Sequence, residues 1–134
     1  MDTGKSSIGL DGNIAAALGY PIGIIAIICL IIEKENRFVK FHALQSILLH
    51  VAFVVVAIAL SVLGIVVGIA GAAASSAGGG GAIGGLFGML IGLVWLVFVL
   101  LYLGALIYAA VKAYGGNKFV LPVIGGMAQK FAGN

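Results

Sequence analysis

Long apolar segments alternate with short polar ones along this chain. Apolar residues dominate positions 14–32, 43–71 and 86–111, and no Asp, Glu, Lys or Arg interrupts them. At about 1.5 Å per residue, a helix over each segment crosses a hydrocarbon core roughly 30 Å thick. The pattern therefore predicts an all-α membrane protein with three transmembrane helices, at about 14–32, 43–71 and 86–111.

Two polar or small-residue stretches separate these segments. Residues 33–40 (EKENRFVK) form a charged loop, and residues 72–85 (AAASSAGGGGAIGG) are rich in glycine. Because consecutive glycines are unfavourable in a helix, we expect 72–85 to form an outer turn. Residues 112–134 are too short and too polar to span, so we expect an interfacial tail with a short helix. Residues 1–134 then form a single membrane domain.

The composition supports a lipid environment. Charged residues make up only 8% of the chain and apolar residues 63%, whereas a soluble domain carries about 25% charged residues. The basic residues are spread over short segments and do not form one soluble face, so we expect no nucleic-acid partner.

Basic residues predict the orientation. With three spans, the N-terminus shares its side with the glycine-rich turn and brings only Lys5 there. The charged loop and the tail share the other side, which holds Lys34, Arg37, Lys40, Lys112, Lys118 and Lys130. Short cytoplasmic loops carry the excess of Lys and Arg. We therefore expect a multi-pass protein of the cell membrane with its N-terminus outside and its C-terminus in the cytoplasm.

Small residues recur about every four positions on the second and third predicted helices. They are Ser61, Gly64 and Gly68 on one helix, and Gly84, Gly88 and Gly92 on the other. Membrane helices associate where small residues let their backbones approach closely. We expect these stripes to face each other in a tight antiparallel hairpin, although glycine is also simply common in membrane helices.

The candidate chemistry is a polar stripe at the start of the second predicted helix. His42, Ser46 and His50 follow each other by one turn, with Gln45 beside them. The two histidines lie about 12 Å apart along the axis, too far to bind one metal ion. The predicted spans contain no carboxylate for an ion pathway. We therefore expect no catalytic, cofactor or metal site, a structural role for the stripe, and no enzymatic activity.

Two segments resemble a known family. They are LGYPIGIIAIICLIIEKENRFVKFHALQSILLH, residues 18–50, and GGNKFVLPVIGGMAQK, residues 115–130. Both resemble a family of small prokaryotic membrane proteins of unknown function, similar to the twenty-kilodalton component of the chloroplast inner-envelope import translocon. His42, Gln45 and Pro122 occupy the family's signature positions. The plastid proteins have four spans, whereas three are expected here.

Three functions remain open at this point. The leading hypothesis is a non-enzymatic subunit that lies in membrane lipid and packs through its small-residue faces with itself or with a larger membrane complex. The resemblance implies an alternative, a component of a protein-translocation system or channel. A second alternative is a lipid-binding adaptor that uses the basic side and the tail.

Overall fold

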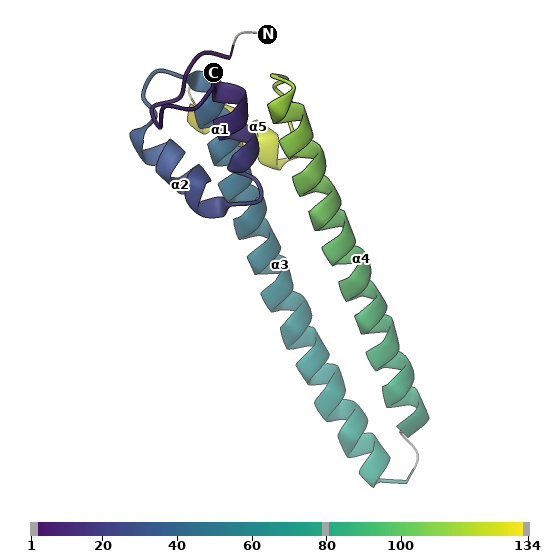
Figure 1. The fold of residues 1–134 in the computed structure, drawn as a ribbon. Coiled ribbons are helices and arrows are strands. Elements are labelled where there is room, and N and C mark those ends of the chain that lie inside the picture. The colour runs from purple at the N-terminus through teal and green to yellow at the C-terminus, as the bar shows by residue number, and fades with distance from the viewer. Residues whose placement is uncertain (1–2, 79–80, 133–134) are drawn as a thin grey trace. The chain divides into compact units, whose positions relative to one another are not determined.

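The described residues of a computed structural model, 3–78 and 81–132, fold into α-helices and connecting segments. The five helices are α1 (Gly12–Leu18), α2 (Gly23–Ile32), α3 (Arg37–Ser76), α4 (Gly81–Tyr114) and α5 (Ile124–Ala132) (Figure 1). The chain divides into two compact units: unit 1 comprises Met1–Ala52 with Leu103–Asn134, and unit 2 comprises Phe53–Tyr102. The predictions of an all-α protein and of a short C-terminal helix are confirmed.

Two helices of the described residues, not three, are long and apolar enough to cross a membrane. They are α3 and α4. The most apolar window of α3 contains no buried residue, while buried residues occur along its first turns as far as Leu49. The part of α3 that suits lipid therefore follows Leu49.

The first predicted span is wrong, because residues 14–32 do not form one helix. Pro21 has no N–H to donate, and Ile22 leaves the helical region with φ −119° and ψ 82°. The carbonyl of Gly19 instead accepts a hydrogen bond from the Ser46 hydroxyl at 2.7 Å. The helix is thus completely broken here, and the 10 residues of α2 reach only about 15 Å.

Unit 1 is built around the first turns of α3. Figure 1 shows α1 and α2 folded against this part of α3, and small side chains make the contact possible. This core consists of Ala15, Ala26, Cys29, Val39 and Ala43. A second cluster joins α5 to the same helix, with Ala128 and Ala132 packed against Phe41, Leu44 and Leu48.

The N-terminal segment lies beside the charged loop. The Asn36 side chain donates a hydrogen bond to the carbonyl of Thr3 at 2.7 Å and accepts one from the Val39 N–H, which caps α3. Asn13 donates to the carbonyl of Tyr114, at the end of α4. The N-terminal segment was expected across the membrane from both the charged loop and the tail. These contacts contradict that arrangement, because a bilayer cannot separate hydrogen-bonded groups.

Unit 2 is an antiparallel hairpin of α3 and α4. On α3 the partly buried positions are Phe53, Ala57, Leu60, Gly64, Val67 and Gly71, which follow the alternating four- and three-residue spacing of a helix seam. The Phe53 ring stacks on Tyr102 with centroids 4.1 Å apart. Farther along, a Cβ atom on Gly71 would lie 3.1 Å from the Cα atom of Gly84. The tight antiparallel hairpin is therefore present.

The predicted stripes form only part of this seam. Gly64 and Gly84 lie in it, whereas Ser61, Gly68, Gly88 and Gly92 are exposed. A residue repeated every four positions drifts by about 40° per step around a helix, while a seam repeats every 3.5 residues. Strict four-residue stripes therefore leave the contact, and larger side chains such as Leu60 and Trp95 replace them.

The glycine-rich turn is shorter than the predicted 72–85. α3 continues to Ser76 and α4 begins at Gly81, while residues 79–80 lie outside the described part of the chain. Alanine favours helix, and the Ser75 hydroxyl bonds back to the Gly71 carbonyl within α3. The close approach of Gly71 and Gly84 packs the first turn of α4 despite its glycines.

Candidate functional site

Four polar side chains are fully buried together in unit 1. Tyr20, His42, Gln45 and Ser46 each have essentially no exposed surface, and we call them the polar cluster. Tyr20 comes from the break between α1 and α2, and the other three come from adjacent turns at the start of α3. Buried polar groups persist only where hydrogen bonds compensate for lost water, so the bonds of the cluster define its role.

Gln45 is the centre of the polar cluster. Its amide nitrogen donates to the Tyr20 hydroxyl at 2.7 Å and to the carbonyl of Phe119 at 3.1 Å. Its amide oxygen accepts a hydrogen bond from the N–H of Leu121 at 3.0 Å. Gln45 thus uses both donors and one acceptor to join α3 to the helix break and to the segment before α5.

His42 shares a hydrogen bond with the Tyr20 hydroxyl. The Tyr20 hydroxyl accepts from Gln45, so its own proton is available to Nδ1 of His42, 2.9 Å away. When the hydroxyl donates this bond, neutral His42 carries its proton on Nε2. The rings of Phe38 and Phe41 pack edge-on against the imidazole.

Burial raises the pKa of the Tyr20 hydroxyl far above its ordinary value, and the hydrogen bond from Gln45 opposes that shift only partly. The hydroxyl therefore stays protonated and remains a donor to His42. A neutral tyrosine, a neutral histidine, an amide and a hydroxyl suit the role of a rigid polar joint.

The predicted polar stripe is only partly assembled. His42, Gln45 and Ser46 come together, whereas Nδ1 of His50 lies 2.8 Å from the Ser46 carbonyl of its own helix, and its ring faces Gly23. Pro122 is exposed and lies outside the cluster, next to Leu121, which does belong to the network.

The basic residues predicted to set orientation lie outside the cluster. The Lys118 ammonium sits 4.9 Å above the centre of the Phe41 ring, and the Lys112 ammonium 5.3 Å above that of Tyr108. Lys34, Arg37 and Lys130 are exposed and Lys40 is half-buried. Cation–π contacts hold the Lys118 and Lys112 side chains against the protein surface.

Glu33 makes a second polar joint, at the end of α2. Its carboxylate accepts hydrogen bonds from the N–H and hydroxyl of Ser7 at 2.7 and 2.9 Å and from the N–H of Asn36 at 3.1 Å. Burial alone would raise the pKa of Glu33, but these hydrogen bonds outweigh it and hold the pKa below its ordinary value. The carboxylate fastens the N-terminal segment to the charged loop.

Sequence reasoning missed Tyr20 and the segment 119–121 as members of the network. A phenol beside Pro21 within an apolar run was an available signal, because a buried tyrosine needs a hydrogen-bond partner. No comparable signal marked Leu121, which contributes only a backbone N–H from 76 positions away.

Comparisons with known proteins agree on a membrane family. The sequence profile of the magnetosome magnetite crystal formation protein family matches residues 8–128. A UPF0132 membrane protein of Methanocaldococcus jannaschii is 37% identical over 133 residues, covering 96% of each chain. A UPF0132 membrane protein of Archaeoglobus fulgidus is 34% identical over 122 residues, covering 90% of this chain and 95% of its own. No solved structure matches. The expected small prokaryotic membrane protein family is confirmed, while no finding bears on the plastid protein.

Proposed function

We propose that this chain, which belongs to the magnetosome magnetite crystal formation protein family, is a non-enzymatic membrane subunit. It associates through a glycine-lined face of its helical hairpin with copies of itself or with a larger membrane complex. The relatives are named membrane proteins, so the surface that such a subunit offers its partner lies within lipid.

The observation that carries this proposal is an unused glycine face on α4. Gly85, Gly88 and Gly92 are three and four residues apart and so share one side of the helix. A Cβ atom built on any of them would have no atom within 4 Å. Their side of α4 is therefore not occupied by α3, and a second helix could approach its backbone closely there.

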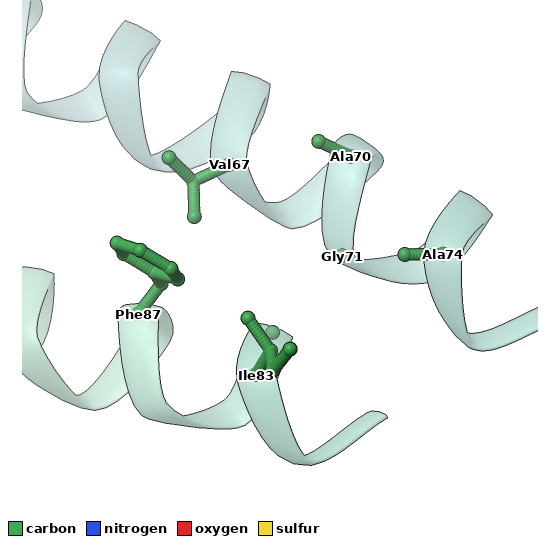
Figure 2. Close-up of a pocket in the computed structure, with 7 residues that line it drawn as sticks. Val67, Ala70, Gly71, Ala74, Ile83 and Phe87 are labelled. Carbon is green, nitrogen blue, oxygen red and sulfur yellow. The ribbon is translucent and has the colours of Figure 1, made fainter. Parts of the chain in front are cut away.

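A groove within the hairpin adds a second recess. It has a volume of about 320 Å³ and an almost entirely apolar lining, formed by Val67, Ala70, Gly71, Ala74, Ile83, Gly84 and Phe87. Figure 2 shows the Phe87 ring and the Ile83 side chain reaching from α4 toward α3. A large side chain of a partner helix would find apolar contacts here.

The proposal includes a revised orientation in the cell membrane. With α3 and α4 as the two spans, all seven Lys and Arg residues flank the spans on the side of the termini, and the turn between the helices has none. The positive-inside rule then places both termini and the charged loop in the cytoplasm. The contacts of Asn36 with Thr3 and of Asn13 with Tyr114 support this arrangement.

The family description concerns magnetite crystal formation. Within residues 3–78 and 81–132, no group of three or more His, Cys, Asp and Glu side chains is placed to hold a metal ion. We therefore base the proposal on the helix surfaces. The translocation or channel role implied by the resemblance stays a prediction.

The test is Gly88→Leu, with Met89→Leu as the matched control. Both positions are exposed on α4, and a Cβ atom added at Gly88 would have no atom within 4 Å. We expect Gly88→Leu to keep its helical circular dichroism but to lose assembly in detergent, measured by light scattering and cross-linking. Met89→Leu should assemble normally. Unchanged assembly of Gly88→Leu would contradict the proposal.

A further inference from the structure

α5 presents small residues to the protein and large apolar residues outward. Gly125, Ala128 and Ala132 are buried, whereas Val123, just before the helix, Met127 and Phe131 are 82%, 45% and 68% exposed. A helix on a water-facing surface has the opposite distribution. The large side chains, spaced four residues apart, form what we call the outer stripe.

The orientation of α5 is fixed by its inner face. A Cβ atom on Gly125 would lie 2.7 Å from the Gln45 amide oxygen, so no larger side chain can take the inner position. Val123 is held at φ 64°, in the left-handed region that β-branched residues rarely adopt. The chain thus keeps an apolar side chain outward in spite of backbone strain.

The charged residues of the tail that carries the outer stripe have one sign. Lys118 and Lys130 are exposed, and the sequence contains no acidic residue after Glu35. An apolar stripe with basic residues beside it matches the interface of a membrane that contains anionic lipids.

We infer that α5 docks flat on the membrane in which the chain is embedded, through the outer stripe and Lys118 and Lys130. Its side chains enter the boundary between headgroups and acyl chains, and the two ammonium groups contact anionic headgroups. The chain itself supports a membrane as the occupant: α5 packs on Phe41, Leu44 and Leu48 in the first turns of α3, and the apolar, unburied part of the same helix follows directly.

The experiment places an environment-sensitive NBD fluorophore on Met127→Cys in a Cys29→Ala background. The labelled protein is reconstituted into vesicles of phosphatidylcholine alone or with 30% phosphatidylglycerol, and the fluorescence is quenched with doxyl-labelled lipids. A probe on Glu35→Cys, in the charged loop, is the matched control. The comparison variant carries Lys118→Gln and Lys130→Gln, and its folding is checked by circular dichroism because the Lys118 ammonium also contacts the Phe41 ring.

We expect the probe at position 127 to be blue-shifted and quenched at shallow depth in the anionic vesicles, and the control probe to stay in water. Each lysine should raise the equilibrium constant for docking roughly five-fold, so the double variant should lower this constant about twenty-five-fold. Salt at 1 M should also lower it, because the ions screen the same charges. Equal quenching in both vesicle types would overturn the role of anionic lipid. A probe that no lipid quenches, but that becomes shielded as the protein-to-lipid ratio rises, would assign the stripe to a protein partner and overturn the inference.

Discussion

Gln45→Leu tests the polar joint in unit 1. Leucine fills a similar volume but removes the hydrogen bonds to Tyr20, Phe119 and Leu121. The buried Leu121 N–H then has no partner, which costs about 1–3 kcal/mol, and the other two bonds contribute about 0.5–1.5 kcal/mol each. We expect the contact between α3 and the tail to weaken by about 2–6 kcal/mol in total.

Hydrogen exchange measured by mass spectrometry detects this weakening through the exchange rates of individual backbone segments. Where exchange follows local opening, a loss of about 2 kcal/mol speeds it roughly thirty-fold, so the amides of residues 119–132 should exchange at least that much faster. Gln129→Leu is the matched control, because Gln129 is a half-buried glutamine of α5 outside the polar cluster; its exchange should stay within about two-fold of the parent protein. Unchanged protection of the tail in Gln45→Leu would refute the role of Gln45.

Three further predictions follow from other contacts. Because the folded pKa of Glu33 is lowered, its carboxylate stabilises the fold above its unfolded pKa of about 4.3, and this contribution disappears as the pH falls through the folded pKa. Glu33→Gln should therefore destabilise the protein at pH 7 and progressively less as the pH falls below the unfolded pKa, measured by thermal unfolding, whereas the exposed control Glu35→Gln should change stability little. Tyr20→Phe should cost about 1–3 kcal/mol, because it leaves the Gln45 donor and His42 Nδ1 without their shared partner; equal denaturant midpoints for variant and parent would contradict this. Gly84→Val should separate α3 from α4, since its Cβ would lie 3.0 Å from the Cα atom of Gly71, and a lower melting temperature than that of Gly68→Val, whose Cβ meets no atom within 4 Å, would show it.

The long helices could be predicted from local pattern, but the fate of the first apolar segment could not. Residues 14–32 have the length and hydropathy of a span, and those properties depend on composition alone. Their break depends on Ser46, which takes the Gly19 carbonyl from 27 positions away. Pro21 signalled a disturbance there, although a proline kink and a complete break have the same sequence signature.

The polar cluster likewise has a part that local pattern predicted and a part that depends on tertiary contacts. His42, Gln45 and Ser46 lie on adjacent turns of one helix, so helical periodicity brings them together. Tyr20 and Leu121 join them only through tertiary packing. The hairpin seam gives a parallel case: small residues correctly indicated close packing, but whether Gly84 or Gly88 faced α3 depended on the register, which the partner helix sets.

The arrangement with two spans and both termini in the cytoplasm is tested most directly by single-cysteine labelling in intact cells. In a Cys29→Ala background, cysteines replace the exposed residues Leu10, Ser76 and Asn117, and a membrane-impermeant maleimide is added before or after permeabilisation. We predict that Ser76→Cys is labelled in intact cells, while Leu10→Cys and Asn117→Cys are labelled only after permeabilisation. Labelling of both Leu10→Cys and Ser76→Cys in intact cells would restore three spans and contradict the structure.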